Sequence, residues 1–566
     1  MKIQTPKDRL YPLFAALLVL MPALTARAAL EFPWIIGNNM VLQRDKPVPI
    51  WGWDDPGQEV TVALGEARAT ATAGKNGKWL VTLPAQKTGG PHTITITGSS
   101  KVELENILFG EVWICSGQSN MGWPLHRCLP NTGEGIPGAD LPGMRSVRLP
   151  NVMAAKPLGD DRAATGLGVY GKQAEIRKTP LMPRPPDRAA TLKAEGAGWQ
   201  VCSEATARHL TGVIYFFGRE LSKELGMPIG LINVSWGGSK IEPWIPPSGY
   251  ESVRALKENA DTLAQRLAKP FNHTAPTVMY NGMIHPLLPC AIRGVIWYQG
   301  ESNGNEGESY TLKMEALVNG WRKEWKQGDF PFYFVQLPNY VAHGGGAHPP
   351  DSDPKGGNGW ARIREAQSKV PARVKNTGMA VTIDVGESNN IHPANKYDVG
   401  RRLALLALAN DYGKKDLVQS GPVFKSMKVA GTRIELSFDH AGGGLLAARK
   451  SGIRSREEAK PSESLDGLAV AGVNPEMPKP VDKVDGFAIA GADRKWHWAE
   501  AALVDGKVIV SSPAVEKPVA VRYGFSANPG RCNLYNREGL PAAPFRTDDW
   551  KFLRYTDHTL GRIVAE

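Results

Sequence analysis

A serine stands just beyond an apolar run in the stretch GEVWICSGQSNMGWPL, which covers residues 110–125. The run VWIC is typical of a buried strand, and Gly117 permits a tight turn before Ser119. In an open α/β sheet ligands bind at the carboxyl ends of the strands, so the hydroxyl of Ser119 would lie at that edge. It could attack an ester carbonyl if a base took its proton. It could equally cap a following helix, and this stretch alone leaves both interpretations open.

Two of the 11 histidines lie in the same tripeptide, IHP, and are candidates for that base. His285 lies in the mostly apolar stretch NGMIHPLLPC, which favours a packing role. His392 follows the polar loop VGESNN and precedes an amphipathic stretch. A histidine in a loop after a strand can reach a serine at the same sheet edge, so His392 is the stronger candidate.

Buried strands alternate with helices over residues 109–421, and these elements would position both candidates. Strands are indicated by EVWIC, IGLINVS, AIRGVIWYQ, FPFYFVQL and GMAVTID. Helices are indicated by TGVIYFFGRELSKEL and DVGRRLALLALANDY. This alternation implies crossover units around a parallel sheet that is covered on both faces. The predicted fold class is therefore α/β, with a three-layer α/β/α core.

Two flanking regions show the period-two alternation of half-buried strands. Residues 29–108 contain EVTVAL, KWLVTL and HTITITG, which predict an N-terminal β-sandwich. Residues 422–524 contain RIELSFDH, KVIVSSP and VAVRYGF, which predict a second β-rich, jelly-roll-like domain. Residues 126–197 are rich in Pro, Gly and Arg and are expected to form a long surface insertion. The loop-like tail, residues 525–566, is expected to pack on the catalytic core.

The N-terminus has the features of an export signal. Lys2, Lys7 and Arg9 precede the apolar run LYPLFAALLVLMPAL, and ARA ends at Ala28. The run is shorter than the ~20 residues that span a bilayer. A cleaved signal peptide over residues 1–28 is expected, with a periplasmic or secreted mature protein and no later membrane segment.

Composition narrows the class of protein further. The 566 residues, 42% hydrophobic and 22% charged, can build two to four domains. The net charge is +11, but the sequence contains no dense basic stretch interleaved with aromatic residues. Nucleic-acid binding is therefore not predicted. Neither HExxH, nor a CxxC pair, nor a phosphate-binding glycine loop is present, so no metal or nucleotide cofactor is expected. The five cysteines could form one or two disulfides, or they could be buried free thiols, and the sequence leaves both alternatives open.

Six segments together carry a family resemblance. In chain order they are GEVWICSGQSNM, GLINVSWGGSKIEPW, YNGMIHPLLPCAIRGVIWYQGESN, WARIREAQ, NTGMAVTIDVGESNNIHPANKYDVGRRLAL and NLYNREGLPAAPFRTDDW. They resemble the bacterial sialate O-acetylesterase family, a branch of the SGNH hydrolases. The opening NNMVLQRDKPVPIWGWDDPGQEV resembles the N-terminal β-domain of that family. The resemblance implies an SGNH-hydrolase core and carbohydrate O-acetyl ester hydrolysis.

The resemblance also implies roles for individual residues. Ser119 matches the family nucleophile, and His392 matches the catalytic histidine. The oxyanion hole would be formed by the backbone N–H groups of Ser119 and of Gly238 in SWGGS. Gln299 in WYQGESN takes the place where SGNH hydrolases supply a side-chain amide.

The third member of the expected triad departs from the family pattern. Many SGNH hydrolases have an aspartate three residues before the histidine, and many relatives read DIHP, but here these positions are Asn389 and Asn390. Neither can stabilise an imidazolium as a carboxylate does. Glu301 in QGES is the favoured replacement, and Asp384 or Glu387 is a second option. A Ser–His dyad assisted by a backbone carbonyl or by Asn390 is the third.

Several side chains are expected to contact the sugar. The proposed set is Gln118, Asn120, Asn390 and Arg364, with arginines of the insertion as further candidates for a sialic acid carboxylate. Trp123, Trp236 and Trp244 lie near the motifs and could stack on a sugar, although core packing is the commoner role of tryptophan.

The favoured substrate is O-acetylated sialic acid, and acetylated xylan or another polysaccharide is the alternative. A hypothesis from another class is a non-catalytic glycan-binding protein whose hydrolase core has lost activity. Retention of Ser119, His392, Gly238 and Gln299 argues against that hypothesis.

Overall fold

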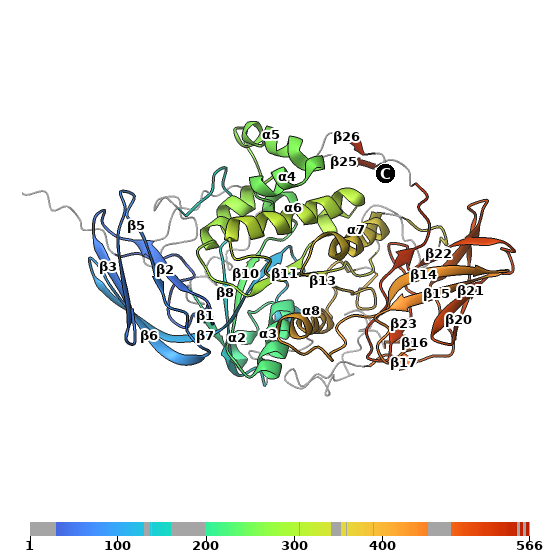
Figure 1. Cartoon of the computed structure of the whole chain (residues 1–566), viewed down its shortest axis with the longest axis horizontal. Coiled ribbons are helices and arrows are strands. Elements are labelled where there is room, and N and C mark those ends of the chain that lie inside the picture. Colours follow the sequence, from blue (N-terminus) through green and yellow to red (C-terminus); the bar gives the residue numbers. More distant parts are fainter. Residues whose placement is uncertain are drawn as a thin grey trace, which may run out of the picture.

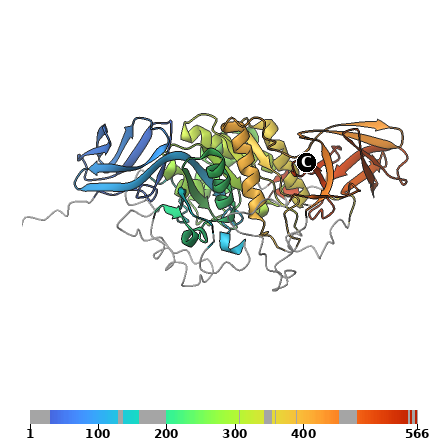
Figure 2. The same cartoon turned by 90° about the horizontal axis from the view of Figure 1, so that it is seen from below.

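The computed structural model describes most of the chain. The described residues are 30–128, 136, 138–159, 198–304, 306–340, 353–357, 359–388, 390–450, 477–551, 555–557 and 562–564. The expected signal peptide, most of the expected insertion and Asn389 lie outside them. The described parts form three units in a row, with N-terminal sheets, a central α/β core and C-terminal sheets (Figures 1 and 2).

A mixed sheet forms the centre of the core. Its strand order is β13-β12-β11-β7-β10-β8-β9, and all neighbouring pairs are parallel except β8 and β9. The strands are β7 (Lys101–Gly117), β8 (Leu141–Arg148), β9 (Gln200–Cys202), β10 (Ile229–Ser235), β11 (Gly294–Tyr298), β12 (Phe332–Val335) and β13 (Thr377–Ala380). The prediction of a purely parallel sheet is therefore wrong at the β9 edge.

Strand β8 lies inside the region predicted to be a surface insertion. It pairs with β10, and its Met144 and Val147 side chains are buried. Pro142, Gly143 and two arginines hide this apolar pair in the sequence. The prediction of a surface insertion over residues 126–197 is thus wrong for residues 141–148.

Helices cover both faces of the sheet. On one face α3 (Gly212–Leu225) packs against α8 (Lys396–Asp411), and on the other α6 (Glu308–Trp325) packs against α4 (Pro247–Ser252) and α7 (Gly359–Arg373) (Figure 1). α5 (Lys257–Leu267) lies beyond α4, and the short α2 (Glu204–Ala207) follows β9. None of the described helices is long and apolar enough to cross a membrane.

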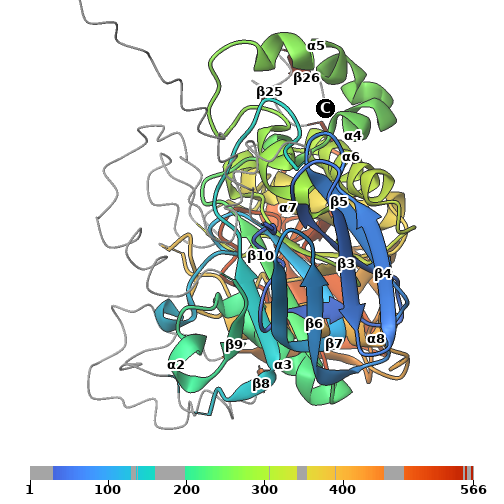
Figure 3. The same cartoon turned by 90° about the vertical axis from the view of Figure 1, so that its left-hand side faces the viewer.

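The N-terminal unit consists of two small sheets (Figure 3). One pairs β2 (Val48–Trp53) with β5 (Lys78–Leu83). The other joins β1 (Val41–Gln43), β3 (Glu59–Leu64), β4 (Ala67–Thr72), β6 (Gly89–Thr97) and the first part of β7. Alternate residues of β3 and β5 are buried, as the period-two pattern predicted.

Strand β7 belongs to both units. Its first part pairs antiparallel with β6, and its last seven residues pair parallel with β10. The expected boundary between residues 108 and 109 therefore falls within one continuous strand rather than in a linker. The strand ends two residues before Ser119.

The C-terminal unit contains three antiparallel sheets. Their orders are β14-β15-β21-β20, β17-β16-β23 and β19-β18-β22-β24. The strands are β14 (Val423–Ala430), β15 (Arg433–Asp439), β16 (Leu445–Arg449), β17 (Lys479–Pro480), β18 (Phe487–Gly491), β19 (Trp496–Trp498), β20 (Glu500–Val504), β21 (Lys507–Ser511), β22 (Pro518–Tyr523), β23 (Leu534–Asn536) and β24 (Phe545–Arg546). The tail supplies β23 and β24 and so completes this unit. It also contacts the core through Asn528 and Arg546. Further along, it contains the hairpin of β25 (Tyr555–Asp557) and β26 (Arg562–Val564).

All five cysteines lie in the described part of the chain, and each is a free thiol. Three of them are buried and two are partly buried. The alternative of buried thiols therefore fits the structure better than one or two disulfides.

Candidate active site

Three loops leave the central sheet at the same edge. The last residue of β7, Gly117, is paired in register with Ser235 of β10 and with Tyr298 of β11. Gly117 has φ +134°, and a Cβ atom there would lie 2.1 Å from the carbonyl oxygen of Tyr298. Only glycine fits this turn, which brings Ser119 to the sheet edge beside the loop that follows β10.

Ser119 and His392 meet at this edge although 273 residues separate them. The Oγ of Ser119 lies 2.8 Å from Nε2 of His392. This is within the range for a hydrogen bond between a nucleophile and its base. His285 lies elsewhere, with Nδ1 2.6 Å from the carbonyl oxygen of Leu158.

The loop that carries His392 is braced by its own side chains. Asn390 Oδ1 accepts from the backbone N–H of His392 at 2.9 Å, and Asn390 Nδ2 donates to Glu387 Oε2 at 2.9 Å. The other oxygen of Glu387 accepts from the backbone N–H of Ala394 at 2.6 Å. Glu387 thus fixes the loop rather than contacting the imidazole ring.

The surroundings of His392 keep its imidazole neutral. Burial, and to a smaller extent the positive charges of Lys396 and Arg127, together lower its pKa to about 4. The ring of Trp123 stacks on the imidazole with centroids 4.1 Å apart and an interplanar angle of 7°. At neutral pH the ring can therefore accept a proton.

No described carboxylate orients the imidazole. Glu301 accepts from Asn120 Nδ2, and its second oxygen lies 3.1 Å from the side-chain amide of Gln118. Asp384 forms a bidentate ion pair with Arg402. Within the described residues, Nδ1 of His392 has no hydrogen-bond partner. The expectation that Glu301 or Asp384 bonds the ring is therefore wrong, because other side chains occupy both carboxylates.

Glu301 belongs to a buried network with Asn120 and Lys396. Asn120 Nδ2 also donates to the carbonyl oxygen of Ile391 at 2.9 Å, and its Oδ1 accepts from Lys396 Nζ at 2.6 Å. Burial raises the pKa of Glu301 and lowers that of Lys396 to about 8. Lys396 also donates to the carbonyl oxygen of Pro393 at 2.7 Å, so the network joins the serine, glutamate and histidine loops. The sequence interpretation missed Lys396, whose only signal is a lysine at the start of an apolar helix.

The backbone N–H groups of Ser119 and of Gly238, in the loop after β10, are candidates for an oxyanion hole. Neither donates a hydrogen bond within the part of the chain that the structure describes. Gly238 has φ +74°, and a Cβ atom on the adjacent Gly237 would lie 3.4 Å from Cβ of Ser119. The loop after β10 therefore passes directly alongside the serine.

Gln299 does not face this position. Its side chain is fully buried, and Nε2 donates to the carbonyl oxygen of Ser239 at 3.2 Å and to Asn303 Oδ1 at 2.8 Å. Its Oε1 accepts from the hydroxyl of Tyr310 at 2.8 Å. Both amide hydrogens are engaged, so the expectation that Gln299 donates directly to an oxyanion is wrong. Gln299 instead links the loop after β10, through Ser239, to the loop after β11, through Asn303.

Two of the four expected sugar-binding residues are fully buried. Asn120 has 0% exposure, and Arg364 has 0% exposure and donates to the carbonyl oxygens of Pro338, Ser526 and Ala527. These expectations are wrong, because neither side chain can reach a sugar. Gln118 is 3% exposed and lies against the Glu301 network. Asn390 remains partly exposed but holds the histidine loop.

The three tryptophans near the motifs also differ in exposure. Trp244 is fully buried, with Nε1 donating to Ser239 Oγ at 3.1 Å. Trp236 is partly buried and stacks on His273 with centroids 6.1 Å apart. Trp123 is partly buried against His392. Sugar stacking is thus excluded for Trp244 by burial.

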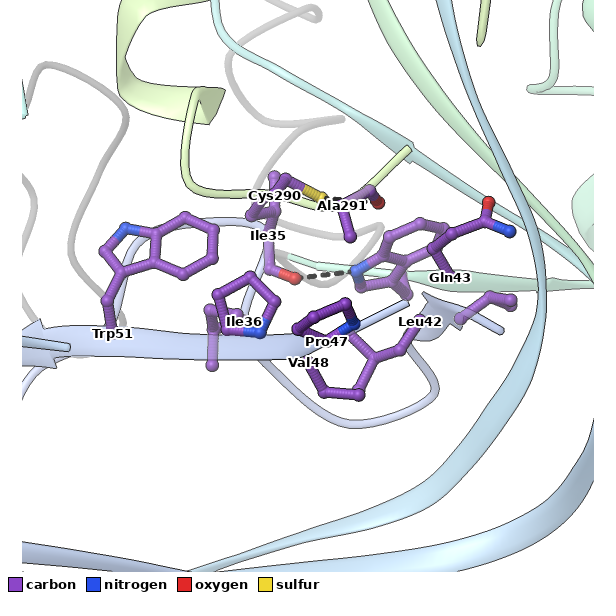
Figure 4. Close-up of a pocket in the computed structure, with 12 residues that line it drawn as sticks. Ile35, Ile36, Leu42, Gln43, Pro47, Val48, Trp51, Cys290 and Ala291 are labelled. Carbon is purple, nitrogen blue, oxygen red and sulfur yellow. Dashed lines mark hydrogen bonds between the residues drawn. The ribbon is translucent and has the colours of Figure 1, made fainter. Parts of the chain in front are cut away.

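A separate apolar pocket lies where the N-terminal sheets meet the core (Figure 4). Trp199 Nε1 donates there to the carbonyl oxygen of Ile35 at 2.8 Å. The pocket is lined by Ile35, Ile36, Val41, Leu42, Gln43, Pro47, Val48, Pro49, Trp51, Trp199, Cys290 and Ala291. It contains neither Ser119 nor His392, so its apolar lining joins two units rather than forming the candidate site.

A known carbohydrate esterase resembles this chain over most of its length. A family model described as "Carbohydrate esterase, sialic acid-specific acetylesterase" matches residues 190–409, a range that contains His392 and Gly238. A crystal structure described as a novel carbohydrate acetylesterase from Xanthomonas citri is 35% identical, with a TM-score of 0.71, and covers 92% of this chain and 100% of that one. Fold and comparisons define the class of protein as a carbohydrate esterase.

Curated relatives identify the family. Sialate O-acetylesterase of Pongo abelii is 31% identical over 437 residues, which are 72% of this chain and 76% of that protein. Sialate O-acetylesterase of Homo sapiens is 30% identical over 435 residues, with the same coverage. The chain belongs to the sialate O-acetylesterase family, and the protein is an esterase.

Proposed function

We propose that this protein removes O-acetyl groups from carbohydrates through an acetyl-enzyme on Ser119, with His392 as the general base. The observation that carries the proposal is the 2.8 Å distance between Oγ of Ser119 and Nε2 of His392. The lowered pKa of His392 supports it, because only a neutral imidazole can take the serine proton.

The first half of the reaction forms the acetyl-enzyme. Ser119 Oγ bonds to the carbonyl carbon while its proton moves to Nε2 of His392. The negative charge on the carbonyl oxygen is stabilised by the N–H groups of Ser119 and Gly238, and one such donor contributes about 3 kcal/mol to transition-state stability. The bond to the sugar oxygen then breaks, and the proton on Nε2 passes to that oxygen.

The second half regenerates the enzyme. Water gives a proton to Nε2 of His392 and adds to the acetyl carbon, and the same two N–H groups stabilise the second oxyanion. The bond to Ser119 Oγ breaks, Oγ recovers the proton, and acetate leaves. Since no carboxylate among the described residues bonds the imidazole, it acts as a Ser–His dyad whose loop is held by Asn390.

O-acetylated sialic acid is the proposed substrate. The description of the matching family model and the names of the curated relatives support it. The relative of known structure is named more broadly, as a carbohydrate acetylesterase, which keeps acetylated xylan or another polysaccharide as the alternative.

We also propose that the protein is exported, with removal of residues 1–28 and a periplasmic or secreted location. The charged start, the short apolar run and the ARA site support this. We further propose that the N-terminal unit is a β-sandwich, that the C-terminal unit is a jelly-roll-like domain, and that the core between them is an SGNH hydrolase.

Acetate release from one protein preparation tests the proposed function. The purified protein is expected to release acetate from O-acetylated sialic acids faster than from acetylated xylan, and Ser119→Ala and His392→Ala should each abolish turnover. Removal of a catalytic serine or histidine typically lowers kcat by roughly 10⁴-fold or more. Full activity of Ser119→Ala would refute the nucleophile, and preference for xylan would select the alternative substrate. Binding of glycan without any turnover would instead favour the non-catalytic hypothesis.

A further inference from the structure

Trp123 makes the closest described aromatic contact with the imidazole of His392. The two rings are nearly parallel, at 7°, with centroids 4.1 Å apart. This places the indole against one face of the ring, while the edge atom Nε2 faces Ser119. Edge and face of the imidazole are thus held by different groups.

The indole is itself mounted on a fixed segment. The carbonyl oxygen of Trp123 accepts from the backbone N–H of Gly212, the first residue of α3, at 2.9 Å. The next residue, Pro124, forms a β-bridge with Thr211, and the backbone N–H of Leu125 donates to the carbonyl oxygen of Leu210 at 2.8 Å. The side chain of Leu125 is fully buried. Trp123 therefore stands on backbone that is tied to α3.

The imidazole needs such a support because no described carboxylate provides the usual one. In a Ser–His–Asp triad the carboxylate bonds Nδ1 and fixes both tautomer and ring orientation. Here Nδ1 of His392 has no partner within the described residues, and Glu301, Asp384 and Glu387 bond other groups. Without a restraint, rotation about the side-chain bonds would carry Nε2 away from Ser119.

We propose that Trp123 is a positioning residue, whose stacked indole holds the His392 ring in the plane that directs Nε2 at Ser119, in place of a triad carboxylate. This rests on the proposed function of Ser119 and His392. Stacking restrains the tilt of the ring without adding negative charge, so it leaves the imidazole neutral.

The same contacts argue against a sugar-stacking role for Trp123. His392 covers the indole at 4.1 Å, and the guanidinium carbon of Arg127 lies over the same ring system, 5.2 Å from its centroid. A sugar platform needs an open ring face. The imidazole covers one face of this ring, and the guanidinium lies over the same ring system.

Kinetics of Trp123→Leu and Trp123→Phe test the proposal. Trp123→Leu should lower kcat roughly 100-fold, the scale of a 1 Å misplacement of a catalytic group. KM should stay unchanged for both a small activated acetyl ester and an O-acetylated glycan. Trp123→Phe keeps an aromatic face and should restore most of kcat. Trp498→Leu, a partly buried tryptophan of β19 in the C-terminal unit, is the matched control and should leave kcat unchanged.

A spectroscopic measurement separates positioning from general stability. In NMR spectra of the full protein with labelled histidine, the ring C–H signal of His392, assigned through His392→Gln, should be shifted upfield by the indole ring current. Trp123→Leu should abolish this shift. It should also move the midpoint of the acid limb of the pH–rate profile to higher pH, because a less restrained imidazole is better hydrated and hydration favours its charged form.

The outcomes are distinguishable from failure of the proposed function. If Ser119→Ala is inactive but Trp123→Leu keeps full kcat, only the positioning role is overturned. If Trp123→Leu raises KM for the glycan alone, the residue is a sugar platform and the proposal is overturned. If Trp123→Leu does not fold, absence of the ring-current shift in the unsubstituted protein overturns it. If Ser119→Ala is active, the proposed function fails first.

Discussion

At the scale of single residues, the neutral imidazole of His392 sets the pH range of the reaction. Burial lowers its pKa to about 4, with Lys396 and Arg127 contributing. Because the reaction needs the neutral form, kcat/KM should remain level as the pH falls from 7 and should drop only near pH 4. A pH–rate profile on a small acetyl ester, from about pH 3 to pH 8, measures this. A midpoint near about 6.5, the ordinary value for histidine, would contradict it.

The same pKa shift affects stability with a definite sign. In the unfolded chain the imidazole takes a proton at about pH 6.5, whereas in the folded protein it does so only at about pH 4. Between these values the unfolded state binds more protons, so this histidine makes the free energy of unfolding decrease as the pH falls. His392→Gln should remove that part of the decrease in urea unfolding.

The asparagine at position 390 is matched to Glu387. Asn390→Asp would restore the acid found in many relatives, but it would replace the donor of the 2.9 Å bond to Glu387 with a second carboxylate. We therefore expect Asn390→Asp to lower kcat and to lower the free energy of unfolding by about 1–3 kcal/mol.

A double substitution tests this reasoning. When Asn390→Asp is combined with Glu387→Gln, the amide introduced at position 387 can donate to the carboxylate introduced at position 390 and still accept from the backbone N–H of Ala394. Urea unfolding of the two single variants and the double variant should give a coupling energy of about 0.5–3 kcal/mol in favour of the pair. Additive losses would show that the two side chains do not depend on each other.

The sequence predicts which residues lie near the site. It does not predict whether their side chains point toward the substrate or into the protein. Ser119, Gly238 and His392 each follow one of the parallel strands of the central mixed sheet, so the fold brings them to one edge. Asn120, Gln299 and Arg364 are polar and lie in the same motifs, yet their side chains are buried. Polarity and position do not distinguish a side chain that faces substrate from one that satisfies buried loops, and only the packing of other segments decides it.

At the scale of elements, the turn after β7 depends on glycine. A Cβ atom at Gly117 would lie 2.1 Å from the carbonyl oxygen of Tyr298, and φ is +134°. Gly117→Ala should therefore lower the free energy of unfolding by about 3 kcal/mol or more. Gly226→Ala is the control, because Gly226 has φ +62° with open space around it. It should cost only about 1–2 kcal/mol in the same urea titration, because a left-handed conformation is unfavourable for alanine. Equal costs would mean that the contact with Tyr298 does not constrain the turn.

The elements themselves were predictable where the apolar pattern was continuous. β10, β11 and the part of β7 that pairs with them are buried, and runs such as VWIC and IGLINVS predict them. β8 is not evident in the sequence because its consecutive buried residues, 144–147, include Arg145 and Ser146 and are preceded by Pro142 and Gly143. Arg145 is nearly fully buried and donates to the backbone of Asn39 and Asn106, contacts that no local pattern reveals.

At the scale of the whole molecule, Glu111 ties the N-terminal unit to the core. Its fully buried carboxylate accepts from Arg44, from Arg293 and from the hydroxyl of Tyr412. Burial alone would raise its pKa, but the hydrogen bonds and charges of Arg293 and Arg44 outweigh burial and lower it.

Loss of that charge should be costly. Glu111→Gln leaves two arginines without their shared carboxylate, and we expect the free energy of unfolding at neutral pH to fall by about 3–5 kcal/mol. Because the folded-state pKa is lowered, the advantage of the glutamate is present above its ordinary value and is lost as the pH falls below it. Urea unfolding should therefore show the two proteins converging in acid.

An exposed ion pair on the same strand provides the control. Glu103 of β7 pairs with Lys101 while its side chain is 49% exposed. Glu103→Gln should change the free energy of unfolding by less than about 1 kcal/mol at every pH. A comparable loss for both substitutions would show that burial of Glu111 adds nothing.

The continuity of β7 also limits how such a protein can be recombined. Strand β7 forms part of an N-terminal sheet and also leads to Ser119 in the core. The N-terminal sheets therefore cannot be exchanged as a separate domain at residue 108 or 109. Slipping this strand by a single residue would turn its side chains to the opposite face in both sheets at once. Chimaeras between homologues should therefore tolerate crossovers in the hairpins before Lys101 and fail when the crossover lies between Lys101 and Gly117.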